Sequence, residues 1–225
     1  MTPTVLVFDL DGTLVDTKHD LTHALNAALA QDGHAPVSSD SLGHLFGHGA
    51  RALLEKGLSL NGVSAPDSAL LDRLQSIFLD HYRANIAVDS RPFPGAVDAM
   101  AALRARGFRI AICTNKKEAL ARQLLDTLGL SGAIDAFVGG DTYALSKPNA
   151  EPVLGAISRA GGAPARAVMI GDSKTDIDAA RAARIPAIAV TFGYTAVPVA
   201  ELAPDAIISA FQTLPDTLAE LGLTP

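Results

Sequence analysis

Short strand-like runs alternate with helical stretches along most of this chain, and this alternation restricts the fold more than any other feature. From Phe93-Pro94-Gly95 onward, each β-type run follows an amphipathic or alanine-rich stretch. Such alternation predicts βαβ units, and therefore an α/β fold with a Rossmann-like parallel sheet and helices on both faces. The run TVLVFD near the N-terminus fits the same sheet, and the later runs are FRIAICTN, AFVGGD, AVMIGD, PAIAVTFG and DAIIS.

Residues 17–90 interrupt this alternation, because their apolar residues recur with helical period. We therefore expect a small all-helical cap at residues 17–90, inserted into an α/β core made of residues 1–16 and 91–225. Such an insertion can act as a lid over the strand ends. The apolar positions that share one helical face are Leu21, Ala24, Leu25, Ala28 and Leu29, and later Leu70, Leu71, Leu74, Ile77 and Phe78.

Composition and charge limit the partners. The 225 residues are 48% hydrophobic, which is enough to fill a large core, and the formal net charge of -6 disfavours nucleic acids and anionic membranes. An anionic substrate would need local cations or a metal. The chain has no apolar run of membrane-spanning length and no signal-peptide start, and its single cysteine, Cys113, suits a reducing compartment. We expect a cytoplasmic protein.

Polar residues follow three of the predicted strands. In open parallel sheets ligands bind beyond the carboxyl ends of the strands, so these residues are expected to form one site. Each also has a local interpretation: Asp11-Gly12 as a turn, Thr114 or Asn115 as a helix cap, and Lys147 as a solvated lysine. The strand-end residues are Asp9 and Asp11, Thr114 and Asn115, and Asp172 with Ser173 and Asp176, and Lys147 lies between the last two groups.

The chemistry of this set points to phosphoryl transfer. Clustered carboxylates stay ionised around a hard cation, and Mg²⁺ suits a site with few carboxylates that also binds phosphate oxygens. Lys147 and the Thr114 hydroxyl can hold the other oxygens. One carboxylate can attack phosphorus, and another two residues later can move the protons.

Four ordered motifs, DLDGTLVD, CTN, SKP and GDSKTD, resemble those of the haloacid dehalogenase-like phosphohydrolases, and the resemblance covers nearly the whole chain. It implies Asp9 as nucleophile and Asp11 as general acid and base. It also implies a Mg²⁺ held by Asp9, the backbone carbonyl of Asp11, and Asp172. Thr114, Lys147, Asn115 and Gly12 are then expected around the phosphate, while Asp176, with Ser173 in support, orients Lys147 or a metal-bound water.

Within this family, TNK, FVGGDT and the late TFGY are most similar to the phosphoglycolate phosphatase group, which implies 2-phosphoglycolate or another small phosphorylated metabolite as substrate. One departure is Arg184, which stands where a glycine often follows the last motif's helix. Because glycine readily forms a left-handed helix end, Arg184 predicts a different ending.

The segment FGHGAR, residues 46–51, raises a second hypothesis about the substrate. Glycines permit close backbone approach, and His48 or Arg51 can bind a carboxylate, although an ordinary interhelical turn explains the segment equally well. The histidine pairs His19/His23 and His44/His48 have a spacing that can bind a metal, but a solvated helix face is the preferred interpretation.

Other functions use the same residues. A sugar phosphatase or a β-phosphoglucomutase-like phosphomutase would share every core residue named above. A phosphoaccepting signalling domain also places Asp, Thr and Lys at strand ends, but it takes its acid cluster and its phosphorylated Asp from different strands. Here Asp9 and Asp11 share one loop, which favours an enzyme.

Overall fold

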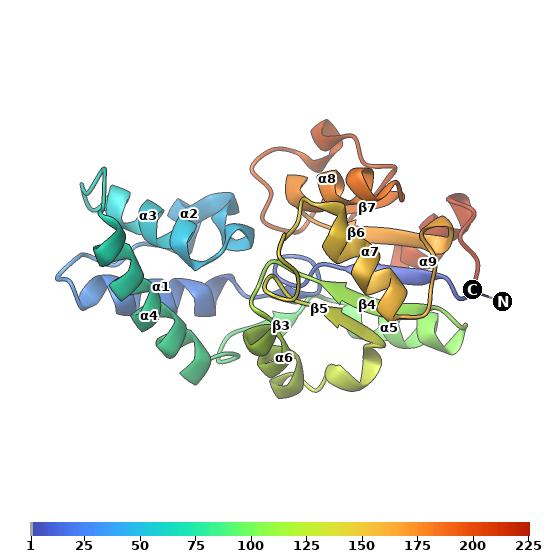
Figure 1. Cartoon of the computed structure of the whole chain (residues 1–225), viewed down its shortest axis with the longest axis horizontal. Coiled ribbons are helices and arrows are strands. Elements are labelled where there is room, and N and C mark those ends of the chain that lie inside the picture. The colour runs from blue at the N-terminus through green and yellow to red at the C-terminus, as the bar shows by residue number, and fades with distance from the viewer. Residues whose placement is uncertain (1) are drawn as a thin grey trace.

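The computed structural model describes residues 2–225 and has two parts, a helical one and one built around a parallel sheet (Figure 1). All neighbouring strands of the six-stranded sheet run parallel, in the order β5-β4-β1-β6-β7-β8. The predicted fold class is therefore confirmed. The strands are β1 Val5–Phe8, β4 Arg109–Cys113, β5 Ala136–Val138, β6 Ala167–Gly171, β7 Ala187–Val190 and β8 Ala206–Ile208.

Helices cover both faces of the sheet. Successive residues of a strand point to opposite faces, so each face can carry its own apolar cluster. In β1, Leu6 and Phe8 belong to one apolar cluster, whereas Val5 and Val7 belong to another. The first cluster includes residues of α5 Ala96–Ala105, α6 Glu118–Thr127 and α9 Leu214–Glu220. The second includes residues of α7 Ala150–Arg159 and α8 Lys174–Ala183.

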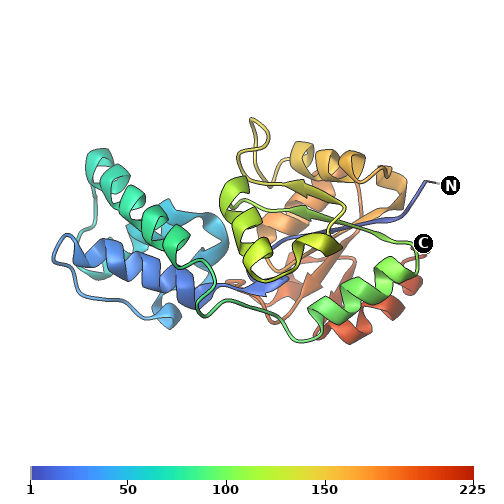
Figure 2. The ribbon, with the colours of Figure 1, turned by 90° about the horizontal axis from the view of Figure 1, so that it is seen from below.

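Residues 17–90, which we call the cap, contain only helices, turns and loops. The apolar faces predicted from the sequence turn inward: Leu21, Leu25 and Leu29 are buried, as are Leu74 and Phe78. Figure 2 shows the cap beside one end of the sheet. Its helices are α1 Lys18–Ala30, α2 Ser39–Leu42, the 3₁₀ helix η1 Gly43–His48, α3 Ala50–Leu60 and α4 Ser68–Ala84.

A two-stranded antiparallel ribbon lies where the chain enters and leaves the cap. It pairs β2 Val15–Asp16 with β3 Arg91–Pro92. Asp11-Gly12 turns the chain as expected, with Gly12 at a φ of 84°. The boundaries of the cap at 16/17 and 90/91 coincide with this ribbon, although the division into two domains stays a prediction.

The expectation for Arg184 is wrong. The C-cap of α8 is left-handed after all, because Arg184 itself takes φ 57° and ψ 42°. The Ile185 N–H then donates to the Ala180 carbonyl at 3.1 Å, so the end of the helix is hydrogen-bonded without a glycine. Within residues 2–225, no helix combines the length and apolarity needed to cross a membrane.

Candidate active site

The three central strands deliver the predicted residues to one edge of the sheet. β1 lies between β4 and β6, so the loop with Asp9 and Asp11 is flanked by Thr114 after β4 and Asp172 after β6. Each of these four residues is at most 7% exposed. Sequence positions more than a hundred residues apart therefore meet in one buried cluster.

Asp9 and Lys147 form the centre of this cluster. The Lys147 ammonium lies 2.9 Å from Asp9 Oδ1 and 2.6 Å from Asp176 Oδ1. Burial, together with the nearby negative charge of Asp176, raises the pKa of Asp9 to about 7. Burial alone would lower the pKa of Lys147, but Asp176 and Asp9 outweigh it and leave that pKa raised. Lys147 is therefore a fixed positive charge beside Asp9.

Asp176 has the two contacts that its position predicts. One oxygen binds Lys147, while the other accepts hydrogen bonds from the backbone N–H and the hydroxyl of Ser173, at 3.1 and 2.7 Å. Ser173 and Asp176 thus form a capping box at the start of α8. The helix start thus fixes the carboxylate that pairs with Lys147.

Asp172 is held from two sides. Its oxygens accept hydrogen bonds from the Thr13 hydroxyl and the Tyr194 backbone N–H, each at 2.8 Å. Gly12 passes so close that an added Cβ would lie 2.6 Å from Asp172 Oδ2. Burial and the charges of Asp176 and Asp9 raise the pKa of Asp172 to about 8.

Asp11 is not free, contrary to the simplest reading of its role as a proton carrier. Its two oxygens lie 2.8 and 3.0 Å from the ammonium of Lys116, and the Thr17 hydroxyl donates to one of them at 2.7 Å. Burial opposes charge on Lys116, yet the adjacent Asp11 carboxylate leaves the pKa of this lysine raised. Asp11 and Lys116 therefore form a buried ion pair.

Thr114 and Asn115 do not cap helix α6, which begins at Glu118 with Lys117 at the cap position. The Asn115 amide instead binds the backbone of Lys147, accepting from its N–H at 3.0 Å and donating to its carbonyl at 3.1 Å. The Thr114 hydroxyl accepts from the Lys116 N–H at 3.2 Å. Asn115 thus anchors the lysine loop, and Thr114 lines the cavity beside Asp9.

The residues present fit a divalent cation. Oxygens of Asp9, Asp172 and Asp176 lie within 4.8 Å of one another, and Lys147 is the one cation paired with Asp9 within residues 2–225. When ionised, the four buried carboxylates exceed the two ammonium groups by two negative charges, the charge of one such cation. The carboxylates are those of Asp9, Asp11, Asp172 and Asp176, and the ammonium groups are those of Lys116 and Lys147.

A cavity of about 220 Å³ opens above this cluster, between the core and the cap. The cap contributes the segment 46–51, so His48 and Arg51 line the cavity as the loop hypothesis requires. The Arg51 guanidinium, however, lies 2.7 Å from Asp72 within the cap, and its side chain is 43% exposed. Arg51 is therefore at the rim and already paired.

Four side chains in this region are not singled out by the sequence. Thr13 belongs to the DLDGTLVD motif and Lys116 to TNK, so both were visible as motif letters without a role. Tyr194 ends TFGY, and its hydroxyl accepts from the Thr17 N–H at 2.7 Å while donating to Asp16 at the same distance. Tyr82, in the last turn of α4, carries no local signal because its contact with Lys116 is purely tertiary.

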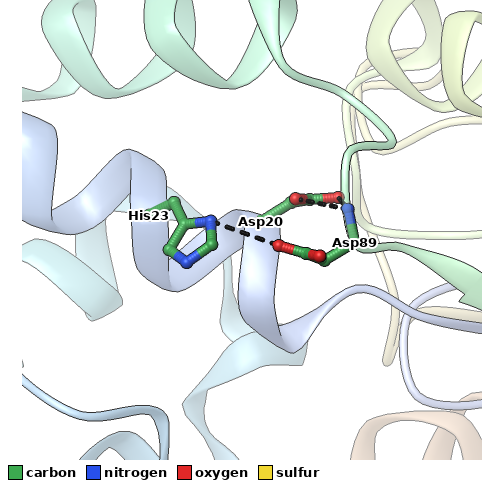
Figure 3. A group of neighbouring side chains, drawn as sticks. All are labelled: Asp20, His23 and Asp89. Atoms are coloured by element: carbon green, nitrogen blue, oxygen red, sulfur yellow. Dashed lines mark hydrogen bonds and ion pairs between the residues drawn. The ribbon is translucent and has the colours of Figure 1, made fainter.

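A second group of acids and a histidine lies away from the cavity (Figure 3). Asp20 on α1 accepts hydrogen bonds from the backbone N–H of Asp89 and from both the N–H and the hydroxyl of Ser90. His23 Nδ1 lies 3.6 Å from the Asp89 carboxylate. Since Asp20 is buried and fully hydrogen-bonded, it joins α1 to the segment that leaves the cap.

Comparison with known proteins agrees with this geometry. The sequence model of a family described as haloacid dehalogenase-like hydrolase matches residues 3–184. The chain belongs to the haloacid dehalogenase-like hydrolases. The family resemblance carried by the four motifs is thereby confirmed, and the chain is an enzyme of the hydrolase class.

Relatives within the haloacid dehalogenase-like hydrolases cover almost the full length. The phosphoglycolate phosphatase of Agrobacterium fabrum is 48% identical over 95% of this chain and 91% of its own length. That of Mesorhizobium japonicum is 45% identical, over 98% and 96%. The crystal structure of a predicted phosphoglycolate phosphatase from Haemophilus somnus superposes with a TM-score of 0.89 at 26% identity, covering 96% of this chain and 98% of its own.

Proposed function

We propose that this chain is a Mg²⁺-dependent phosphomonoester hydrolase, that its substrate is 2-phosphoglycolate, and that it works through an aspartyl-phosphate on Asp9. The observation that carries the proposal is the position of Asp9, 2.9 Å from the Lys147 ammonium at the floor of the cavity. The substrate is supported by the names of the relatives and by the limited volume under the cap.

In the first step an Asp9 oxygen bonds to phosphorus while the ester bond to the alcohol oxygen breaks. Lys147 and Thr114 hold the phosphoryl oxygens. Asp11 is ionised in its pair with Lys116, so it first takes up a proton from solvent when that pair opens, and it then gives this proton to the departing alcohol. In the second step water attacks phosphorus, the Asp9–phosphorus bond breaks, and Asp11 takes the water's proton. Bound Mg²⁺, held by Asp9, Asp172 and the Asp11 carbonyl, would supply positive charge that offsets the charge of the phosphoryl group.

We assign the cap, residues 17–90, the role of covering this site. Its aromatic and aliphatic residues Phe46, Leu53 and Phe78 line the upper wall of the cavity. An apolar roof excludes bulk water from the reacting groups, which strengthens the interactions of Lys147 and Asp11 with the substrate.

The test is release of inorganic phosphate from 2-phosphoglycolate, a sugar phosphate and an aryl phosphate, with Mg²⁺ and with a chelator. We expect release only with Mg²⁺, and the highest kcat/KM for 2-phosphoglycolate. Asp9→Asn should abolish release, and Asp11→Asn should slow the breakdown of the aspartyl-phosphate. Asp98→Asn, an exposed position on α5, is the control.

Near-normal activity of Asp9→Asn would refute the nucleophile. Conversion of a sugar phosphate into its isomer, without free phosphate, would instead identify a phosphomutase, which shares the same core residues.

A further inference from the structure

The cavity contains a buried lysine for which the reaction above has no use. Lys116 lies two residues after Thr114 in the chain, and only 7% of its side chain is exposed. Its ammonium contacts both oxygens of Asp11, at 2.8 and 3.0 Å, and lies 4.6 Å from the centre of the Tyr82 ring on α4. The charge is thus held between a carboxylate of the core and an aromatic ring of the cap.

The other cations that line the cavity are differently placed. Lys147 is shared by Asp9 and Asp176, and Arg51 is paired with Asp72 at the exposed rim. Lys117 is more exposed than Lys116. Within residues 2–225, Asp11 is the one acid paired with Lys116. This buried lysine is therefore in direct contact with the proposed proton carrier.

This contact conflicts with the proposed role of Asp11. Both of its oxygens are engaged by the ammonium, so an ester oxygen can reach this carboxyl only when the ion pair changes. A buried ammonium does not give up an anion without replacement, because charges are costly to leave unpaired in a low-dielectric site. A second anion beside Lys116 would make the exchange possible.

The proposed substrate carries such an anion in the required place. In 2-phosphoglycolate the carboxylate is attached to the carbon that bears the ester oxygen. When Asp11 faces that oxygen, the carboxylate is therefore next to the Asp11 partner, Lys116. The Tyr82 ring can hold the ammonium during the exchange, since an aromatic face attracts a desolvated cation.

We propose that Lys116, supported by the Tyr82 ring, selects phosphate esters of short 2-hydroxy acids by exchanging its ion pair with Asp11 for one with the substrate's carboxylate. The proposal rests on the phosphatase function and goes beyond it by naming the selecting residue and the substrate class. It also assigns the main role in substrate selection to the buried Lys116 and not to the exposed Arg51.

The test compares 2-phosphoglycolate with 2-hydroxyethyl phosphate, which has an alcohol in place of the carboxylate. For the wild-type chain we expect kcat/KM to favour the acid by about 100-fold. In Lys116→Met the preference should fall to about threefold or less, mainly through slower hydrolysis of the acid. Lys117→Met, the neighbouring lysine at the cavity wall, is the matched control and should keep the preference.

Further variants separate charge from packing. Lys116→Arg keeps the charge and should keep most of the preference. Tyr82→Phe keeps the ring and should keep most of the preference, whereas Tyr82→Leu removes the ring and should lower the preference. Because the preference is a ratio measured on one preparation, partial misfolding of a variant cancels from it.

The outcomes are distinguishable from those for the function itself. Retained preference in Lys116→Met, or an equal loss in Lys117→Met, overturns the assignment of Lys116. If Lys116→Met yields no folded protein, Tyr82→Leu decides, and an unchanged preference there overturns the proposal. If the wild-type chain hydrolyses both esters equally, the proposal for Lys116 is overturned, but the proposed phosphatase function is not. Failure to hydrolyse any ester with Mg²⁺ overturns the function as well.

Discussion

Lys147 and Asp176 form an ion pair of 2.6 Å in which neither side chain exposes more than 2% of its surface. Removing one partner of a buried pair leaves an uncompensated charge. We expect Asp176→Asn to lower the free energy of unfolding by about 3 kcal/mol. This value is at the low end of the range for broken buried ion pairs, because Lys147 remains paired with Asp9. kcat should fall about tenfold, since Lys147 loses one of its two positioning contacts.

Urea unfolding and steady-state kinetics measure both effects. Asp178→Asn is the control on the same helix, because this partly exposed acid pairs with Lys174 and Arg181 and should contribute less than about 1 kcal/mol. Equal behaviour of the two variants would contradict the assigned role of Asp176.

The raised pKa values of Asp9 and Asp172 predict a link between pH and Mg²⁺. Between the ordinary carboxyl pKa of 3.8 and the folded values of about 7 and 8, the metal-free folded chain holds protons that the unfolded chain has released. The contribution of these two groups to stability is therefore largest at low pH and declines as the pH rises through 7 and 8. The proposed Mg²⁺ would bind the ionised carboxylates and so offset this loss.

Thermal unfolding from about pH 5 to about pH 9, with and without Mg²⁺, measures this effect. The rise in Tm caused by Mg²⁺ should grow with pH up to about 8 and then level off. A rise that stays constant across this range would contradict metal binding at Asp9 and Asp172.

A substitution at Gly12 tests how closely the Asp11-Gly12 turn packs against Asp172. Gly12→Ala places a Cβ 2.6 Å from Asp172 Oδ2 and also strains a residue at φ 84°. We expect a loss of stability of more than about 1 kcal/mol, together with weaker Mg²⁺ binding measured by calorimetry. Gly33→Ala has similar strain at φ 73°, but among the described residues no atom beyond its two chain neighbours lies within 4 Å of its Cβ. The control should therefore lose stability without losing Mg²⁺ affinity.

Tyr194 joins the carboxylate cluster to the start of the cap. Its backbone N–H binds Asp172, whereas its hydroxyl accepts from the N–H groups of Thr17 and Lys18 at the start of α1. Tyr194→Phe removes only the hydroxyl, so we expect a loss of about 1 to 2 kcal/mol in chemical unfolding. Mg²⁺ affinity should stay unchanged, because the backbone contact remains. A large drop in that affinity would show that the hydroxyl also supports Asp172.

Arg51 lies at the rim, so its charge should attract the anionic substrate without taking part in the chemistry. We expect Arg51→Ala to raise the KM for 2-phosphoglycolate about threefold, with kcat nearly unchanged and a smaller effect at high salt. Arg73→Ala, an exposed arginine paired with Asp32, is the control. A fall in kcat for Arg51→Ala alone would place this side chain against the reacting groups.

Much of the fold was predictable from local pattern. A buried parallel strand needs a continuous apolar run and a crossover helix, so TVLVFD and AVMIGD are recognisable as strands without tertiary information. The candidate site was predictable for the same reason, because parallel strands bring residues such as Asp9, Thr114 and Asp172 to one edge. The Arg184 expectation was wrong, because the rest of the chain can hold a non-glycine residue in a left-handed conformation.

The sequence by itself determined which chemical groups meet at the edge of the sheet: acids, a hydroxyl and a lysine at strand ends. Only the tertiary structure decided how their charges are distributed. Asp11 pairs with Lys116, from 105 positions further along the chain, and Tyr82 of the cap covers that pair. The physical reason is that burial makes the partner of each charge as important as the charge itself, and partners from different elements leave no periodic or spacing signal.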